Sequence, residues 1–479
     1  MSGTSTVPAG SATGARPWAR VGMAALIILV TALGALLGAV PGDLVPYVAA
    51  GVVSILLTLF CIGRPAWLLY FILFTSAFAG FFGVFESGRV GGVSVSGLRW
   101  VVVASLALLV LAVNLRRVYV SRTMVPFLVF AAWSLVGFLH HPLGFTGLKD
   151  VVFFALPPLA SIYTLLVLRY DQPGVSRVVE RVITASLTVP IVLYAILFAL
   201  GQVSFTRLGP EGLIGPRVVA LYLLVVIGVS LAQWRYGETE MQRLIGLGVS
   251  VVATLTIFLT LSRTASVTAL AVIVGSRMHP KYPLRVIASG LVVLVLTGLL
   301  LWLVPQFRER TFYKVGPDLV STLRYFNTSG RIVLWPATYE HAMKQPLVGW
   351  GPGAARILLG PLSSNPNDED QKYPHNEYLL VVHDLGLIGL AVFLAAWGFL
   401  VRRYWRGWRL ADAAGDRRRA RWSLAALLAA VVVLLSAIAA NTLHYSFLMV
   451  PAFIIFGIRD YWVEHGGEGP SNPSPVPAS

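Results

Sequence analysis

The stretch YPHNEYLLVVHDLGLIGLAVFLAAWGFLV, residues 373–401, decides the fold. After Asn376 it continues for about 25 mostly apolar residues, enough for a helix to cross a hydrocarbon core of about 30 Å. The backbone of such a run must be helical, because lipid offers no partners for free N–H and C=O groups. Similar runs recur along the chain, of whose 479 residues 57% are hydrophobic and only 12% charged. This composition predicts an all-α polytopic membrane protein and excludes a soluble domain.

The apolar runs predict about 12–14 transmembrane helices in two blocks, 19–304 and 376–462. A large extracytoplasmic loop with short helices, 305–375, is expected between the two blocks, because a connection of this length within a compact fold is usually functional. The tails 1–18 and 463–479 are rich in small and polar residues or proline and are expected to be disordered. The predicted spans are 21–40, 44–62, 66–84, 98–115, 123–140, 150–168, 182–201, 217–234, 244–262, 264–278, 285–304, 376–400, 422–440 and 446–462.

The basic residues predict which ends of the helices are cytoplasmic. If the spans alternate, seven basic segments fall on one side, which the positive-inside rule makes the cytoplasmic side. Both termini are then cytoplasmic, and the net charge of +16 serves topology and lipid headgroups rather than nucleic acid. A single cysteine, Cys61, excludes a disulfide framework. The seven segments are ARPWAR, GRP, NLRRVYVSR, LRYDQPGVSRVVER, WRYGETEMQR, GSRMHPKYPLR and the presumed loop VRRYWRGWRLADAAGDRRRARW.

On the opposite, outer side, polar residues gather at a few places. Arg217 opens the eighth span, Ser262 and Arg263 form a tight reversal between spans, and His375 and Asn376 precede the twelfth span. Within the long loop, residues 329–356 predict a helix, which Pro346 ends. Its expected apolar stripe consists of Ile332, Trp335, Tyr339 and Ala342, and Arg331 lies at its start. The GWGPG that follows, 349–353, allows the backbone to approach a ligand or another helix closely.

An outer site has no nucleotide sugars, so a glycan-processing enzyme there needs a lipid-linked donor such as a polyprenyl diphosphate sugar. The departing diphosphate needs positive charge, which arginine forks supply, and the attacking hydroxyl needs a base, for which histidine is suited. Arg217, Arg263 and Arg331 are the candidate cations and His375 the candidate base. Each has an ordinary structural alternative: Arg263 as an anchor at a helix end, and His375 as an interfacial histidine.

Several neighbouring polar residues have simpler interpretations. Asn376 suits a helix N-cap, and His383 suits a hydrogen-bonding group inside the span. Arg207, Arg324 and Arg356 are expected to be surface charges. The acidic run Asp368, Glu369 and Asp370 is typical of a solvated loop, because consecutive carboxylates point in different directions. We therefore predict neither a metal site nor a cofactor.

The residues in this region resemble the O-antigen ligase and polysaccharide polymerase superfamily, the Wzy/WaaL-like membrane glycosyltransferases. His375-Asn376, nine residues and Gly386 match its His-Asn-x9-Gly signature, and LGLIGL (385–390) resembles its ending. The Ser262-Arg263 turn, Ser329-Gly330-Arg331 with Trp335, and QPLVGWGPG (345–353) match in the same order. The resemblance covers about 260–390.

The resemblance implies a metal-independent, inverting glycosyltransferase with a GT-C-like helical fold in the bacterial cytoplasmic (inner) membrane. It would transfer a glycan from undecaprenyl diphosphate to an acceptor hydroxyl on the outer face. His375 would be the catalytic base or would position the acceptor. Arg263 and Arg331 would bind the diphosphate, and Arg217 is a weaker candidate for the same task. Asn376, Ser262 and Gly386 would support the site.

Three functions remain open at this point. A polymerase joins the glycan to a second lipid-linked glycan, whereas a ligase joins it to a lipid or protein. The excess of arginine over lysine, with abundant Ala, Val and Gly, is typical of a GC-rich genome and favours the polymerase slightly. A lipid-linked glycan transporter is the third reading, with Asp384 and Asp150 as the candidate ion-coupling carboxylates. A chain-length regulator or a flippase is a candidate protein partner.

Overall fold

The computed structural model forms two compact units, Met1–Arg64 and Pro65–Ser479. The residues it describes all lie in the second unit, to which the following account is confined. They are 66–77, 89–90, 93–94, 111–112, 115–171, 175–186, 191–192, 196, 199, 216–260, 262–278, 284–303, 305, 331–362 and 372–465. The predicted spans 21–40 and 44–62, most of 98–115 and 182–201, and the acidic run 368–370 lie outside the described residues.

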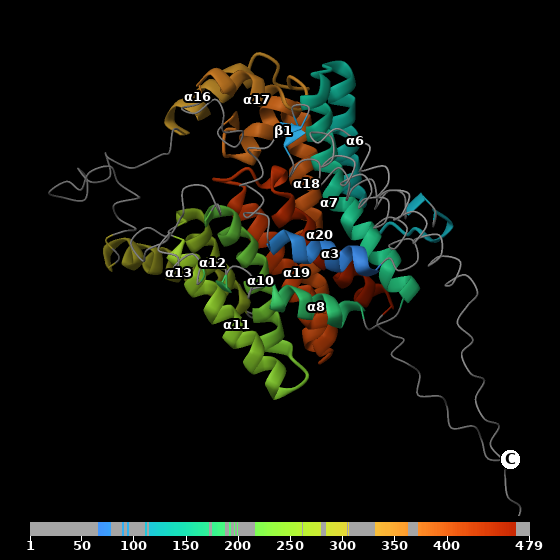
Figure 1. The fold of residues 1–479 in the computed structure, drawn as a ribbon, viewed down its shortest axis with the longest axis vertical. Coiled ribbons are helices and arrows are strands. Elements are labelled where there is room, and N and C mark those ends of the chain that lie inside the picture. The colour runs from blue at the N-terminus through green and yellow to red at the C-terminus, as the bar shows by residue number, and fades with distance from the viewer. Residues whose placement is uncertain are drawn as a thin grey trace, which may run out of the picture. The chain divides into compact units, whose positions relative to one another are not determined.

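Helices make up nearly all of the described structure, which confirms the predicted all-α class (Figure 1). The strands in it, β1 (Arg89–Val90) and β2 (Val93–Ser94), form one short antiparallel pair. The helices are α3 (Ala66–Ala77), η1 (Leu115–Arg117), α6 (Val125–His140), α7 (Gly144–Asp171), α8 (Val175–Ala185), α10 (Pro216–Tyr236), α11 (Glu240–Leu259), α12 (Arg263–Ser276), α13 (Leu284–Leu303), α16 (Arg331–Ala342), α17 (Ala354–Leu359), η2 (Gly360–Leu362), α18 (Glu377–Ala413), α19 (Arg417–Ser436), η4 (Thr442–His444) and α20 (Ser446–His465).

Six of the described helices are long and apolar enough to cross a membrane, which confirms a polytopic membrane protein. The total of 12–14 spans stays a prediction, because several predicted spans lie outside the described residues. Shorter apolar helices cover Val125–His140, Arg263–Ser276 and Gly290–Leu299. The six long spans are Gly144–Arg169, Val219–Tyr236, Glu240–Leu259, Glu377–Ala413, Arg417–Ser436 and Ser446–Glu464.

The core is formed by long helices that pack against one another. α10 packs against α11, α12 and α19, while α7 packs against α20 and α18 against α19. Aromatic rings fill the contact of α6, α18 and α20, where Phe127 lies edge-on to Trp397 and Phe453, with ring centroids 5.1 Å apart in both pairs. These rings hold the bundle that carries the outer elements α16 and α17.

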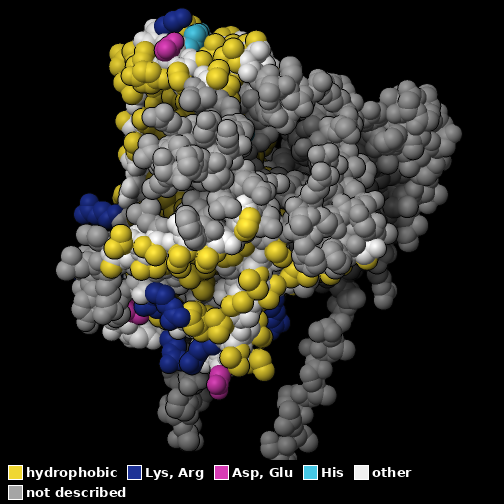
Figure 2. Space-filling model, turned by 90° about the vertical axis from the view of Figure 1, so that its left-hand side faces the viewer, with side chains coloured by type: hydrophobic (Ala, Val, Ile, Leu, Met, Phe, Trp, Pro, Cys, Tyr) yellow, Lys and Arg dark blue, Asp and Glu magenta, His cyan; other side chains and the backbone are white. Residues whose placement is uncertain are grey.

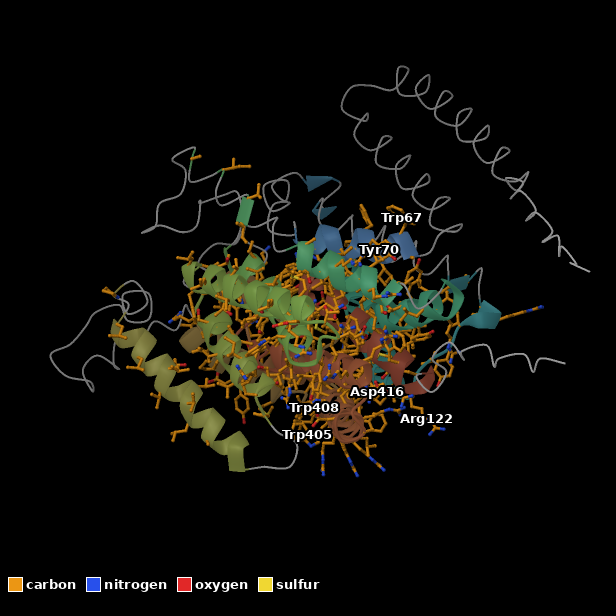
Figure 3. All side chains as sticks on the ribbon, turned by 90° about the horizontal axis from the view of Figure 1, so that it is seen from below. Trp67, Tyr70, Arg122, Trp405, Trp408 and Asp416 are labelled. Atoms are coloured by element: carbon orange, nitrogen blue, oxygen red, sulfur yellow. The ribbon has the colours of Figure 1, made fainter. Side chains whose placement is uncertain are left out.

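The predicted basic loop at 401–421 is wrong, because most of this stretch is helical. α18 continues to Ala413, and only a short turn separates it from α19 at Arg417. The sequence prediction missed a buried stripe among these basic residues. Tyr404 and Trp408, which are spaced as on one face of a helix, are both buried. The indole of Trp408 donates to the hydroxyl of Tyr236 at 2.9 Å, and this hydroxyl donates to Asp412 at 2.7 Å (Figure 3 labels Trp408).

Contacts between basic and acidic groups gather at this same end of the bundle. Arg235, at the end of α10, donates to the carbonyls of Ser276 and Met278 after α12, at 2.7 and 2.9 Å. The exposed pair Arg418–Glu238 joins the start of α19 to the turn before α11 at 3.1 Å. In Figure 2, most of the visible Lys and Arg side chains gather toward the lower end, below hydrophobic side chains. The ends predicted to be cytoplasmic therefore lie together.

Candidate functional site

A sharp turn carries His375 into α18. His375 has φ = 53°, the left-handed region, and it is the one non-glycine with positive φ in the part of the chain that the structure describes. Such a conformation costs roughly 1–3 kcal/mol and persists only where the surroundings hold it. The side chain of Asn376 caps the helix by accepting from the N–H of Leu379 at 3.0 Å. Asn376 is thus a helix N-cap, which is the structural role that the sequence predicted for it.

The turn is fastened on both sides to the loop between α19 and α20. Before it, the ring of Tyr373 packs on the ring of His444, with centroids 4.3 Å apart. After it, the N–H of Glu377 donates to the carbonyl of Ala437 at 2.9 Å, and the Glu377 carboxylate accepts from the N–H of Leu443 at 2.9 Å. We call residues 437–445 the α19–α20 loop. This loop holds His375 in its strained conformation.

The α19–α20 loop and the His375 turn also bind α16, which begins with Arg331. The guanidinium of Arg331 donates to the carbonyl of Ala439 at 2.8 Å. One turn later, the indole of Trp335 donates to the carbonyl of Pro374, the residue before His375, at 2.7 Å. The structure therefore brings Arg331 and His375, two predicted site residues about forty positions apart, to one place.

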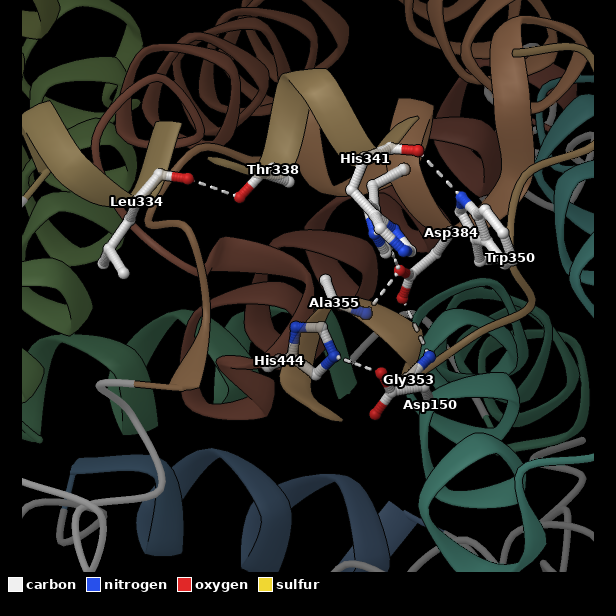
Figure 4. Close-up of polar contacts among 10 residues, drawn as sticks. Asp150, Leu334, Thr338, His341, Trp350, Gly353, Ala355, Asp384 and His444 are labelled. Atoms are coloured by element: carbon white, nitrogen blue, oxygen red, sulfur yellow. Dashed lines mark hydrogen bonds and ion pairs between the residues drawn. The ribbon is translucent and has the colours of Figure 1, made fainter. Parts of the chain in front are cut away.

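The buried face of α16 differs from the predicted stripe. Leu334, Thr338 and Ala342 are buried, whereas Tyr339 is 56% exposed. The difference arises because Thr338, a polar residue, satisfies its hydroxyl within the helix by donating to the Leu334 carbonyl at 2.6 Å (Figure 4), and can therefore be buried.

The other two predicted cations lie on helices that begin toward the same end of the bundle. Arg263 is the first residue of α12 and is half-buried. The far end of α12 meets the end of α10 through Arg235, so Arg263 lies toward the end where α18 begins. Ser262 is at the N-cap position without a side-chain cap bond. Arg217 is the second residue of α10, and its side chain is outside the described part.

Gly386 and the GWGPG segment dock against each other, backbone to backbone. Gly386 has φ = 71° and interrupts α18. The amides freed by this break find partners, since Leu387 N–H donates to the Pro346 carbonyl at 2.7 Å. From the other side, Trp350 N–H donates to the His383 carbonyl at 3.0 Å and Gly351 N–H to the Asp384 carbonyl at 2.9 Å. Of the two roles predicted for GWGPG, the structure shows close approach to another helix.

A chain of side-chain bonds reinforces this docking (Figure 4). His383 was predicted as a hydrogen-bonding group inside the span, which the structure confirms, but its partners Asp384 and His341 were not predicted. Asp384 accepts from the N–H groups of Gly353 and Ala355 at 2.8 and 2.9 Å. His383 Nδ1 lies 2.7 Å from the Asp384 carboxylate, and His383 Nε2 lies 2.9 Å from His341 Nδ1 on α16. With Asp384 ionised, His383 donates to it through Nδ1. Burial, together with the nearby His383, lowers the pKa of His341, so His341 favours the neutral form.

Asp150, which pairs with His444 next to Tyr373, was also not predicted as part of the site. This carboxylate on α7 is fully buried and lies 3.2 Å from Nε2 of His444. Burial would lower the pKa of His444, but the Asp150 and Glu377 carboxylates outweigh it and raise that pKa. Only the apolar context of Asp150 in the sequence could have hinted at this pair, because His444 is distant along the chain.

An open surface pocket of about 450 Å³ lies beside this region. It lies between the start of α7 and α17, and Lys372 places it next to the His375 turn. Its lining residues are Thr146, Arg356, Ile357, Gly360, Pro361 and Lys372. Among the described residues, no three His, Cys, Asp or Glu side chains are arranged to share a metal ion.

Comparison with known proteins supports the predicted resemblance. No curated protein matches this sequence. A family model described as O-antigen ligase matches residues 248–394. The match runs from α11 into α18 and includes Arg263, Arg331, His375 and Gly386. Residues 248–394 therefore resemble an O-antigen ligase domain, and this match supports the O-antigen ligase and polymerase superfamily predicted from the motifs.

Proposed function

We propose that the protein is a glycan polymerase on the outer face of the bacterial cytoplasmic membrane, with both termini in the cytoplasm. It transfers a glycan from undecaprenyl diphosphate to the hydroxyl of an acceptor sugar. The observation that carries this proposal is the attachment of Arg331 and the His375 turn to the same α19–α20 loop. A cation for a departing diphosphate and a base for an incoming hydroxyl thereby lie in one region, within the domain that matches the family.

In the proposed reaction, His375 takes the proton of the acceptor hydroxyl as its oxygen attacks the anomeric carbon. The bond from that carbon to the diphosphate oxygen breaks, and the diphosphate leaves with the bonding electrons. Arg331, Arg263 and Arg217 offset its negative charge. A single displacement of this kind inverts the configuration at the anomeric carbon and needs no metal ion. The pocket beside Lys372 is the proposed entry for a sugar of the acceptor.

A ligase reaction is the second candidate function, and the description of the matching family favours it directly. It would use the same donor and the same residues, with a lipid or a protein as the acceptor. The arginine-rich composition still favours the polymerase. Ion-coupled transport is less well supported, because Asp384 is bound by two backbone amides and an imidazole rather than exposed to a pathway.

The test uses purified protein in nanodiscs with a polyprenyl-diphosphate oligosaccharide, with and without EDTA. Release of polyprenyl diphosphate and growth of the glycan are both followed. We expect a ladder of longer lipid-linked glycans that survives EDTA. We expect His375→Ala to slow it about 10²–10⁴-fold, the usual contribution of a general base, and Arg331→Gln to slow it about 10²-fold or more.

Two control variants remove comparable groups from the same end of the molecule. His140→Ala deletes an exposed imidazole at the end of α6, and Lys344→Gln deletes an exposed cation after α16. Both should retain wild-type rates. Turnover only with a lipid or protein acceptor would establish the ligase. Full activity in His375→Ala would show that the turn is structural and would refute the proposed site.

A further inference from the structure

An exposed apolar turn follows α16. Its tip, residues 346–348, carries Leu347 and Val348, which are 62% and 40% exposed although neither belongs to a helix that could cross a membrane. Met343, just before the turn, and Tyr339 on α16 are exposed as well. Figure 2 shows hydrophobic side chains over much of the upper end of the molecule, where α16 lies in Figure 1. An exposed apolar patch of this kind marks an interaction surface.

The tip is bonded to an exposed part of α18. The carbonyl of Pro346 accepts from the N–H of Leu387 at 2.7 Å. The carbonyl of Leu347 accepts from the N–H of Ile388 at 3.3 Å. Leu387 and Ile388 are themselves 45% and 40% exposed, and they belong to a helix that is long and apolar enough to cross a membrane. In such a helix an apolar side chain that no protein covers faces lipid. The apolar surface of the tip therefore continues the lipid-facing surface of α18.

Distances along α18 place this contact within the depth of the hydrocarbon core. Arg402 is exposed, and it is the first charged residue of α18 after Asp384. Leu387 lies fifteen residues before Arg402, which is about 22 Å of helix. Because a hydrocarbon core is about 30 Å thick, lipid that begins at Arg402 reaches beyond Leu387. Any tilt of the helix shortens the distance along the membrane normal and strengthens this conclusion.

A second helix gives the same depth. α6 has 16 residues and follows the exposed Arg122, so it is about 24 Å long. A core of about 30 Å that begins near Arg122 therefore reaches the last turn of α6. Leu139 in that turn is largely exposed. The chain just after the tip packs here, since a Cβ on Gly351 would lie 2.9 Å from the Cβ of His141. Both helices thus place the tip at the edge of the hydrocarbon core.

The backbone of the turn meets the condition that lipid imposes on irregular structure. Non-helical backbone at membrane depth is tolerated only where protein satisfies its polar groups. α18 binds two carbonyls of the tip, and it also accepts the N–H of Trp350 at the His383 carbonyl, at 3.0 Å. Pro346 has no N–H to satisfy. Lys344, before the tip, is exposed, and its long stem lets the ammonium reach the headgroup layer.

We propose that the tip is a membrane anchor, in which Leu347 and Val348 contact the acyl chains of the leaflet nearest α16. The partner is the bilayer itself, so this inference does not depend on the reaction proposed above. α16 is then held at both ends, because Arg331 at its first residue binds the carbonyl of Ala439 and the anchor follows its last turn. The helix cannot lift from the membrane surface unless one of these two attachments breaks.

The test measures the surroundings of position 347 directly. In a Cys61→Ser background, a nitroxide is attached to Leu347→Cys and the protein is reconstituted in nanodiscs. Power-saturation EPR compares collisions with oxygen, which concentrates in hydrocarbon, and with a neutral nickel chelate, which stays in water. Leu394→Cys on α18 is the lipid reference and Arg417→Cys on α19 the water reference, since both original side chains are exposed. We expect position 347 to favour oxygen several-fold, as position 394 does.

A second position tests the anchor with a different probe. Bimane attached to Val348→Cys, in the same background, should be quenched by lipids that carry bromine on their acyl chains and not by the unbrominated lipids. Bimane on Leu394→Cys should be quenched in the same way, whereas bimane on Arg417→Cys should not. The two tip variants change different side chains, so a folding defect in one leaves the other measurement intact. Melting temperatures in nanodiscs establish that each variant is folded.

The outcomes are distinct. Preference for oxygen at position 347 together with quenching at position 348 establishes the anchor. Collisions with the nickel chelate as frequent as at Arg417→Cys would overturn it, since the tip would then face water and be open to a protein partner. Few collisions with either reagent, or no quenching at position 348, would overturn it because protein would then cover the tip. None of these measurements needs turnover, so a failure of the proposed glycan transfer leaves them intact.

Discussion

At the scale of single residues, glycine is required at position 386 because two backbones meet there. A Cβ on Gly386 would overlap the carbonyl of Leu347, and its φ of +71° already disfavours any L side chain. We expect Gly386→Ala to lower stability by about 2–3 kcal/mol, since strain and overlap add. Gly398 is the matched control in the same helix, because a Cβ there meets nothing within 4 Å.

The measurement is thermal unfolding of both variants in the same detergent. Gly398→Ala should leave the melting temperature unchanged or raise it slightly, since alanine favours the helix by about 1 kcal/mol over glycine. Equal melting temperatures for the two variants would contradict the docking of the 349–353 segment on α18.

Single residues also show what the sequence could predict of the site. His375, Arg331 and Gly386 stand in short local motifs that can be recognised without any knowledge of the fold, and His375 is also marked by its polarity at the mouth of a span. His341 and His444 carry no such local signal, because their partners become neighbours only through packing. His341 meets His383 across 42 positions of chain, and no periodicity in either segment encodes that distance.

At the scale of elements, α16 is held to α18 partly by the bond between His341 and His383. Burial and His383 lower the pKa of His341 below its ordinary value of 6.5. A detached α16 therefore binds a proton more readily than a docked one, so docking is complete above about pH 6.5 and weakens as the pH falls below it.

We expect hydrogen exchange of the α16 amides, corrected for intrinsic rates, to be faster at pH 5.5 than at pH 7.5. In His341→Gln this pH-dependent difference should disappear, because the titrating group is gone. His140→Gln should retain it. Identical α16 exchange at the two pH values in the wild type would show that this bond does not hold the helix.

Elements were predicted well where they are purely apolar and poorly where charge is interleaved. α19 and α20 start and end within a few residues of the predicted spans. The second half of α18 was taken for a loop, because four arginines between Val401 and Leu410 outweigh its buried Tyr404 and Trp408. Positive charge predicts which side of the membrane a segment faces, but it does not predict where a helix ends, since α18 continues through these arginines to Ala413.

At the scale of the whole molecule, the described helices alternate in direction, so that the basic segments between them lie at one end of the bundle, as predicted. The ends joined by Arg235, Asp412 and Arg418 gather opposite the end that carries α16, α17 and the His375 turn. The positive-inside rule predicts that the arginine-rich end lies in the cytoplasm and the candidate site outside.

Cysteine labelling can test this orientation, because the chain has one native cysteine. In a Cys61→Ser background, Lys344→Cys places a thiol on the exposed segment after α16, and Arg418→Cys places one at the start of α19. A membrane-impermeant maleimide added to intact spheroplasts should label Lys344→Cys several times more than Arg418→Cys. Permeabilised spheroplasts should label both equally, which controls for the reactivity of each thiol. If Arg418→Cys reacts first in intact spheroplasts, the His375 turn faces the cytoplasm, where nucleotide sugars replace the lipid-linked donor and the proposed reaction loses its premise.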